Sequence, residues 1–129
     1  GPAHDAFSKP YNYEFSPAKG RQHYNKPIVV LCNRGSFSAT NNFVSIMKQL
    51  PNVTIIGDTT GGGCGLPFTS ELPNGWSVRF SAAVIRDAEG NITEFGVAPD
   101  IKVDMTEADR LSGHDTILDT AISHLLHKK

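Results

Sequence analysis

The sequence has few cysteines, no long apolar run and no excess of charge of either sign. Its 129 residues include two Cys, and 12 Lys and Arg stand against 13 Asp and Glu, which gives a formal net charge of -1. Two cysteines without C-x-x-C spacing exclude a disulfide scaffold and the usual zinc and redox motifs, so we expect no metal and no cofactor. Nucleic-acid binders usually carry a basic excess, which makes DNA and RNA poor candidate ligands.

No apolar run approaches the roughly 20 residues that span a bilayer. The longest candidates, residues 28–31 and 53–56, have the length of strands. The beginning of the sequence also lacks the charged region and apolar region of a secretory signal. We therefore expect no membrane-spanning segment.

The first 26 residues differ in composition from the rest. Residues 1–26 combine three prolines with five aromatic residues spaced without helical periodicity, which predicts an irregular arm or connection. The full sequence is 39% apolar and 19% charged, which is typical of one globular domain or part of one, and we expect residues 27–129 to form it.

Residues 27–56 predict a strand, a helix and a second strand. Residues 27–33 are β-branched and apolar on both faces, as in a buried parallel strand. Apolar residues then recur at helical spacing over residues 38–50, and residues 53–56 form a second apolar run. This order predicts a parallel β-α-β unit, and thus an α/β fold with a mainly parallel sheet and flanking helices.

The following segments are predicted to be a glycine-rich loop, further strands and two helices. Residues 57–65 contain five Gly and form a loop whose backbone can approach a ligand. Strands over 66–72 and 76–86 are joined by a turn, and the alternation of Trp76, Val78 and Phe80 with polar residues predicts a half-buried strand packed on the core. A turn over 87–91 and a short final strand within 96–103 follow.

Helix signals close the chain. Thr106 is expected to cap a brief helix that ends near Gly113, and Asp115 to cap the last helix. The last helix carries an apolar stripe that is predicted to pack on the sheet. The stripe comprises Ile117, Leu118, Ala121, Ile122, Leu125 and Leu126.

Ser36, Ser38 and Thr40 fall between the first strand and the first helix. A Ser at a helix start has two uses, which are capping the free N–H groups and acting as a nucleophile whose oxyanion those groups stabilise. Capping is the more common role, and the local sequence leaves both open. The residues two before and two after Ser38 are not Gly, which disfavours the α/β-hydrolase elbow.

Three segments in this order resemble the tail-specific, or C-terminal-processing, serine peptidases, whose catalytic core is shared with tricorn protease. They are residues 26–41 (KPIVVLCNRGSFSATN), 53–63 (VTIIGDTTGGG) and 94–101 (EFGVAPDI), and the resemblance covers about residues 26–125. It implies a ClpP/crotonase-like β-β-α superhelix, of which residues 27–129 would be the C-terminal part of the catalytic core.

The resemblance also implies roles for individual residues. Ser38 matches the nucleophile, flanked by Ser36 and Thr40, and the N–H of Ala39 would be an oxyanion donor. Glu94 matches a carboxylate that orients the base. Gly62 and Gly63 lack the spacing of a phosphate cradle and are expected to form a wall beside a bound peptide.

The general base departs from the commonest pattern of the family, which places a Lys in a Gly-Lys-Gly loop. Residues 61–65 hold no Lys, and Lys48 lies about three turns along the helix from Ser38. The tricorn-like alternative takes a His from an earlier part of the polypeptide, so the 129 residues alone are expected to be inactive. His114 is a less favoured in-chain candidate.

Neither cysteine is a candidate nucleophile. Cys32 is expected to be a small core residue on a strand. Cys64 is expected to be partly exposed in the glycine-rich loop, where no neighbouring cation or His would activate its thiol.

The sequence thus predicts a hydrolase, a serine-type peptidase that cleaves peptide bonds of peptide or protein substrates through an acyl-enzyme. The family further implies a periplasmic, cell-envelope or secreted location. The strand at 28–31 risks an open edge, which the arm or a second copy of the chain would cover, so a homo-oligomer is possible. Two alternatives use related folds: a non-catalytic module that binds lipid, retinoid or peptide, and a crotonase-like acyl-CoA enzyme.

Overall fold

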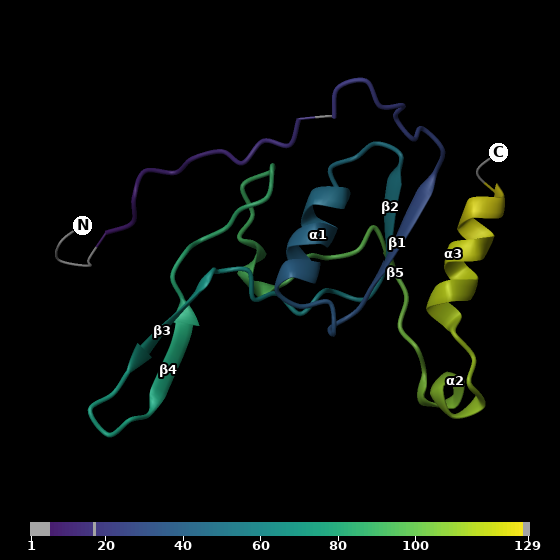
Figure 1. The fold of residues 1–129 in the computed structure, drawn as a ribbon. Coiled ribbons are helices and arrows are strands. Elements are labelled where there is room, and N and C mark those ends of the chain that lie inside the picture. Colours follow the sequence, from purple (N-terminus) through teal and green to yellow (C-terminus); the bar gives the residue numbers. More distant parts are fainter. Residues whose placement is uncertain (1–5, 17, 128–129) are drawn as a thin grey trace.

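The computed structural model in Figure 1 describes residues 6–16 and 18–127. The elements before the hairpin are β1 (Ile28–Cys32), α1 (Ala39–Met47) and β2 (Val53–Gly57). The hairpin consists of β3 (Pro67–Glu71) and β4 (Ser77–Ser81). The 3-10 helix η1 (Thr93–Phe95), β5 (Ile101–Lys102), α2 (Glu107–Ser112) and α3 (Thr116–His127) follow.

A three-stranded parallel sheet organises the fold. Its strand order is β1-β2-β5, and β2 pairs with β1 from Ile28 opposite Val53 to Cys32 opposite Gly57. The last strand is short and pairs with the end of β2, where Ile56 lies opposite Ile101. The predicted parallel β-α-β unit and the mixed α/β class are therefore confirmed.

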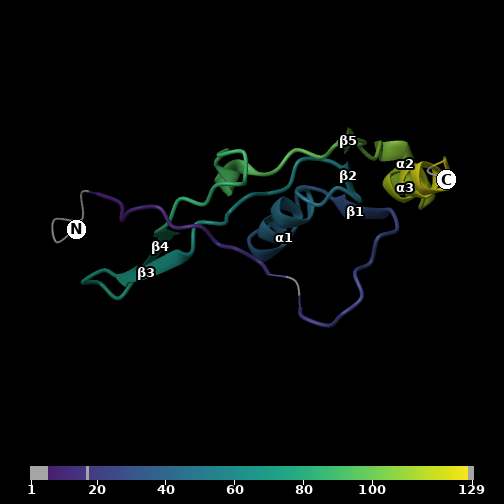
Figure 2. The same cartoon turned by 90° about the horizontal axis from the view of Figure 1, so that it is seen from above.

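Helices cover the two faces of this sheet, each over its own core cluster. On one face Val44 of α1 packs with Cys32 and Ile55, and on the other Ile117 and Ala121 of α3 pack with Ile56. Alternate residues of a strand point to opposite faces, which explains why neighbouring Ile55 and Ile56, both fully buried, join different clusters. The views in Figures 1 and 2 show α1 and α3 on either side of the sheet.

The β3–β4 hairpin projects away from the sheet, on the side of the molecule opposite α3 (Figures 1 and 2). Its predicted packing on the core is wrong: every residue of both strands is exposed, and 71% of the surface of Trp76 is accessible. The strand also ends at Ser81 rather than at residue 86. The N–H groups of Ala82 and Ala83 both donate to the carbonyl of Gly65 at 2.8 Å, which turns the chain out of the ladder.

The caps of the two C-terminal helices agree with the sequence. Thr106 and Asp109 form a reciprocal capping box at α2, which ends at Gly113 in the left-handed conformation. Asp115 Oδ1 accepts the N–H of Leu118 at the start of α3.

The predicted apolar stripe of α3 is buried only in part. Ile117 and Ala121 are buried, whereas Leu118, Ile122, Leu125 and Leu126 are exposed. The sheet explains this difference, because β1 is its edge strand and the described residues add no further strand to widen the surface that α3 covers.

The described part of the arm, residues 6–16 and 18–26, contains no helix or strand. Its aromatic rings are exposed, and Tyr11, Tyr13 and Phe15 contact one another in sequence. No backbone hydrogen bond joins these described residues to β1, so the expected covering of that edge by the arm is wrong for them. Covering by a second copy, and a domain boundary at residue 26, stay predictions.

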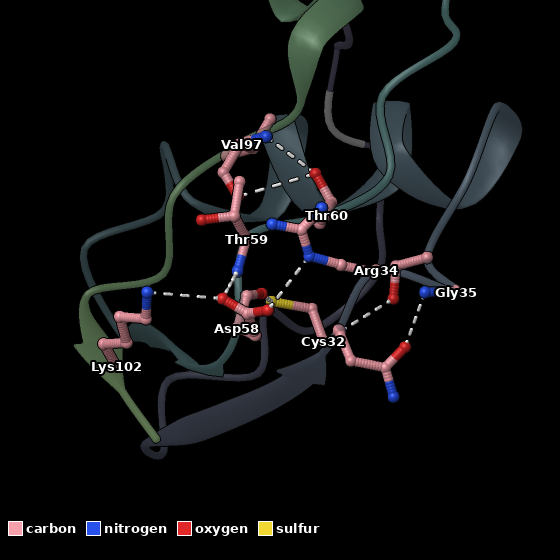
Figure 3. Close-up of polar contacts among 10 residues, drawn as sticks. Cys32, Arg34, Gly35, Asp58, Thr59, Thr60, Val97 and Lys102 are labelled. Atoms are coloured by element: carbon pink, nitrogen blue, oxygen red, sulfur yellow. Dashed lines mark hydrogen bonds and ion pairs between the residues drawn. The ribbon is translucent and has the colours of Figure 1, made fainter. Parts of the chain in front are cut away.

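Asp58 ties together the carboxyl ends of the three strands (Figure 3). It follows β2, and its carboxylate accepts the N–H of Thr59 at 2.7 Å and lies 3.6 Å from both Arg34, after β1, and Lys102 of β5. The Thr59 hydrogen bond, together with the charges of Lys102 and Arg34, holds the pKa of Asp58 below its ordinary value of 3.8. Ionised Asp58 is thus better stabilised in the folded chain than in the unfolded one.

We expect Asp58→Asn to lower the melting temperature at pH 7, because the variant loses both ion pairs. The pKa of Asp58 is lower in the folded chain than its ordinary value of 3.8, which we take for the unfolded chain. Ionised Asp58 therefore stabilises the fold at a pH above 3.8, and this stabilisation is lost as the pH falls through the pKa of the folded chain. The difference in melting temperature between the parent chain and the variant should therefore shrink as the pH is lowered below 3.8. Circular dichroism melts from pH 7 to pH 2.5 measure this, and a deficit that grows on acidification would contradict it.

Asp104→Asn is the matched control. Asp104 lines the same small cavity as Asp58 and Arg34 but makes no ion pair among the described residues. Its substitution should leave the pH dependence of the melting temperature close to that of the parent chain.

Candidate active site

Ser38 lies at the turn between β1 and α1, with a strained backbone. Its φ of 57° and ψ of -118° are unusual for a residue with a side chain. The N–H of Ser38 donates to the carbonyl of Gly62 at 2.8 Å, and its carbonyl accepts the N–H of Asn42 at 3.0 Å. Hydrogen bonds on both sides therefore hold this conformation in place.

The side chain of Ser38 does not cap the helix, although Ser38 occupies the N-cap position of α1. Within the part of the chain that the structure describes, its hydroxyl has no hydrogen-bond partner, and the residue is half-buried. The common structural role of a Ser at a helix start is thus not realised here. The conformation resembles that of a nucleophile held on a tight strand-to-helix turn.

Ala39 begins α1 directly after Ser38. The residue is exposed, and its N–H makes no hydrogen bond to another described residue. The N-terminal end of a helix carries a partial positive charge. An N–H at this place is suited to stabilise a negative oxygen that develops beside Ser38.

The glycine-rich loop packs directly against Ser38 and Glu94. A Cβ on Gly62 would lie 2.0 Å from the carbonyl oxygen of Glu94, and one on Gly63 would lie 2.3 Å from the ring of Phe37. Both glycines also have a positive φ. These internal contacts explain why Gly is needed at both positions, while their contact with a substrate stays a prediction.

Glu94 lies in η1 and is hydrogen-bonded to the glycine-rich loop, which is in turn hydrogen-bonded to Ser38. Its carbonyl accepts the N–H of Gly63 at 2.9 Å, and its Oε1 accepts the hydroxyl of Ser81 at 2.7 Å. The side chain is half-buried. The structure therefore brings Ser38 and Glu94 to the two sides of one loop without direct contact between their side chains.

A buried amide, not predicted from the sequence, connects these parts. Asn41 on the first turn of α1 is fully buried, and its Nδ2 donates to Cys64 Sγ and, at 3.1 Å, to the carbonyl of Thr93. Its Oδ1 accepts the hydroxyl of Thr60. That hydroxyl in turn accepts the N–H of Val97 at 2.6 Å, a contact drawn in Figure 3. A signal for Asn41 existed, because this polar residue precedes Val44 by three positions on the buried face of the helix.

The two cysteines are both buried and free. Cys32 is a core residue as predicted, and burial, followed by the negative charge of Asp58, raises the pKa of its thiol. The expectation that Cys64 is partly exposed is wrong, because 7% of its surface is accessible. Its side chain turns inward from the glycine-rich loop and accepts the amide of Asn41, which explains the burial.

No basic side chain contacts Ser38 among the described residues. Lys48 donates to the carbonyl of Ala98 at 2.6 Å and pairs with Asp100 at 3.2 Å, which agrees with its exclusion as a base. The in-chain candidate His114 pairs with Asp119 at 3.3 Å and not with Ser38 or Glu94. His4 lies outside the described residues.

The described residues contain no cluster of His, Cys, Asp and Glu that could hold a metal ion. Within this same part of the chain, no helix has the length and apolar character needed to cross a membrane.

Comparison with known sequences shows similarity to proteases. The sequence profile of peptidase family S41 matches residues 3–103. The carboxy-terminal-processing protease of Bartonella bacilliformis is 30% identical over 94 residues, and the carboxy-terminal processing protease CtpA of Bacillus subtilis is 29% identical over 99 residues. These alignments cover 72% and 76% of this chain, but 22% and 21% of the two proteases.

Solved structures show the same relationship. A candidate peptidase from Parabacteroides merdae is 52% identical, with a TM-score of 0.87 over 95% of this chain and 38% of its own. Mature CPAF complexed with lactacystin is 26% identical, with a TM-score of 0.72 over 85% of this chain and 23% of its own. Tricorn protease shares the fold, with a TM-score of 0.65 over 91% of this chain and 13% of its own.

The buried amide of Asn41 gives a prediction for stability. Asn41→Ala should lower the free energy of unfolding by about 2–3 kcal/mol, because it removes the side chain that accepts the Thr60 hydroxyl and donates to the Thr93 carbonyl in the core. The neighbouring Asn42 is exposed, and Asn42→Ala should change it by less than about 0.5 kcal/mol. Urea denaturation of both variants measures the difference, and equal effects would contradict the assigned role.

Proposed function

Because this chain belongs to peptidase family S41, we propose that it carries the nucleophile of a serine-type peptidase that cleaves protein substrates through an acyl-enzyme on Ser38. One observation carries the assignment. Ser38 has a strained backbone and a hydroxyl without a partner among the described residues, next to the free N–H of Ala39 at the start of α1.

In the first half of the proposed reaction, Ser38 Oγ attacks the carbonyl carbon of the scissile peptide bond. The general base takes the hydroxyl proton, and the carbonyl oxygen becomes a tetrahedral oxyanion that accepts the N–H of Ala39. The C–N bond then breaks, and the protonated base gives its proton to the leaving amine. Ser38 keeps the acyl group as an ester.

In the second half, water attacks that ester. The base takes a proton from the water, and a second tetrahedral oxyanion forms at the same N–H. The C–Oγ bond breaks, the proton returns to Ser38 Oγ, and the carboxylic acid product leaves. The two halves use the same donors and the same base in turn.

The base in this proposal is a His from polypeptide outside the 129 residues. The described Lys48 and His114 are both engaged elsewhere, and the chain spans only about a fifth of the length of the curated proteases it matches. Glu94 would accept the second ring N–H of that His and so fix its tautomer. Ser81 holds Glu94 Oε1, which leaves Glu94 Oε2 for the His.

Cleavage near the carboxyl terminus of a protein is the activity named for the relatives from Bacillus and Bartonella, and we extend it to this chain as part of the proposal. The ClpP/crotonase superhelix and a periplasmic, cell-envelope or secreted location stay predictions that rest on family resemblance.

Fluorophosphonate labelling tests the nucleophile. In the full-length peptidase that contains this chain, we expect the reagent to label Ser38, and Ser38→Ala to abolish labelling and lower kcat by about 10⁶-fold. Ser36→Ala is the matched control, since Ser36 lies on the same turn and its hydroxyl accepts the N–H of Asn33. It should keep most of the labelling.

The 129 residues alone should be labelled only weakly, because no base contacts Ser38 in their described part. Strong labelling of the isolated chain that Ser38→Ala removes would contradict the external base. Absence of labelling in the full-length protein would contradict the peptidase mechanism and favour a non-catalytic binding module.

Glu94→Gln should lower kcat by about 10²–10⁴-fold, less than Ser38→Ala, because the amide no longer stabilises the charged His. The pH dependence of kcat separates this role from a structural one: the acidic limb should shift to lower pH in the variant, as the pKa of the His falls. Ser81→Ala should shift the acidic limb in the same direction by a smaller amount. A loss of kcat without any shift of the limb would argue against the role.

A further inference from the structure

The β3–β4 hairpin has one continuous apolar face. Alternate residues of a strand point to the same face, and residues directly opposite on paired strands share that face. The rings of Phe68 and Phe80, which are opposite each other, have centroids 5.7 Å apart. Every member of the face is at least 40% exposed, so the described residues leave it uncovered. The members are Phe68, Leu72, Trp76, Val78 and Phe80.

The outer edge of β4 is open to a further strand. The N–H of Leu72 donates to the carbonyl of Trp76 at 2.7 Å, so this pair is hydrogen-bonded, and hydrogen-bonded pairs alternate along an antiparallel ladder. Arg79 lies three positions after Trp76, and its N–H and carbonyl therefore point to the outer edge. Among the described residues the hairpin sheet has two strands. An open edge beside an apolar face favours pairing with another chain.

Residues 11–15 of the arm have the side-chain pattern of a strand without a partner. Tyr11, Tyr13 and Phe15 alternate with polar residues, and the centroids of successive rings lie 6.5 and 5.8 Å apart. Side chains two positions apart meet in this way when the backbone is extended and they share one face. The rings are exposed, and residues 11–15 make no backbone hydrogen bond to the rest of the described chain.

The arm segment and the hairpin match in charge as well as in alternation. Glu14 lies on the polar side of the arm segment, and Arg79 lies on the polar face of the hairpin. Neither makes an ion pair with another described residue. With Glu14 beside Arg79 at the outer edge of β4, opposite charges are adjacent on the polar face. The two rings that flank Glu14 then lie beside Val78 and Phe80 on the apolar face.

The arm of the same chain is directed elsewhere. It runs from the side of the hairpin toward β1 (Figures 1 and 2). Its Phe7 borders the same small cavity as Ser81 and Ala83, at and past the end of β4. Residues 11–15 follow Phe7 on the way to β1, so they lead away from the hairpin of their own chain.

We propose that residues 11–15 of one chain pair with the outer edge of β4 in a second copy, so that two chains exchange their arms in a symmetric dimer. Each chain supplies one aromatic segment and one uncovered hairpin, and a closed two-fold pair therefore satisfies both surfaces of both chains. The dimer does not depend on the proposed peptidase mechanism.

Charge reversal tests the pairing in the 129-residue chain. Sedimentation equilibrium should show a dimer, and Glu14→Arg or Arg79→Glu should each raise its dissociation constant about tenfold, because each dimer contains the contact twice. The double variant Glu14→Arg/Arg79→Glu should return to within about threefold of the parent chain. Arg21→Glu is the control, since Arg21 is an exposed arm residue outside 11–15, and it should change the constant less than about twofold.

Disulfide cross-linking identifies the occupant of the hairpin edge in the full-length protein that contains this chain. One preparation carries Glu14→Cys and a second carries Arg79→Cys, and the two are mixed and oxidised. Directly opposite residues lie about 5.5 Å apart, within reach of a disulfide, whereas the natural Cys32 and Cys64 are buried. A covalent dimer should form in the mixture and not in either preparation alone.

A monomer at every concentration, or a dissociation constant unchanged by both charge reversals, would overturn the proposal. A disulfide within one chain of the double variant Glu14→Cys/Arg79→Cys would also overturn it, and would assign the edge to the arm of the same chain. Absence of any cross-link in the full-length protein would assign the edge to other polypeptide of that protein. If a variant fails to fold, NOEs between Val78 methyl groups of one labelled copy and arm rings of an unlabelled copy decide the matter in the parent chain.

Discussion

The buried amide of Asn41 is the interaction on which the geometry of the candidate site depends. It bonds three segments that are distant in sequence: the start of α1, the glycine-rich loop through Thr60 and Cys64, and η1 through Thr93. Ser38 lies three residues before Asn41, and Glu94 directly follows Thr93. A fully buried polar group has no alternative partner in water, so this network permits only one relative placement of the two residues.

The strain at Ser38 follows from this fixed placement. A backbone conformation with φ 57° and ψ -118° is unfavourable for a residue with a side chain and persists only where the surrounding structure determines it. Here Phe37 bridges to Gly62 and stacks its ring on Gly63, while Gly62 accepts the N–H of Ser38. The contact needs the loop to lack side chains, because a Cβ at either glycine would collide with the ring of Phe37 or the carbonyl of Glu94. The glycines and the strained serine therefore form one unit.

The sequence predicts correctly those helices, strands and caps that depend on residues close to one another in the chain. The apolar run of β1, the helical spacing of α1 and the caps at Thr106 and Asp115 all depend on neighbours within a few residues, and each occurs where it was expected. The hairpin shows the limit of this approach. The alternation of Val78 and Phe80 specifies a two-sided strand but not which surface, if any, covers its apolar side, and both residues are exposed.

The same limit applies within the site. Ser38 and Glu94 were named from motifs, but their connection runs through Asn41 and Thr60, whose roles depend on contacts across 19 to 52 residues of sequence. Burial of Cys64 has the same origin. The identity of a single residue in a motif suggests its chemistry, whereas the contacts that hold it in place involve residues with no motif of their own.

This organisation has a consequence for the proposed mechanism. In the proposed mechanism, Ser38, the N–H of Ala39 and Glu94 act from segments that contacts within this chain join, whereas the proposed base belongs to other polypeptide. Folding of this chain thus supplies most of the conformational entropy loss that ordering the site requires, before the proposed base is in place. The Ser81 bond to Glu94 keeps the carboxylate directed until then, so a His delivered by other polypeptide needs to adopt only one position for the proposed reaction to begin.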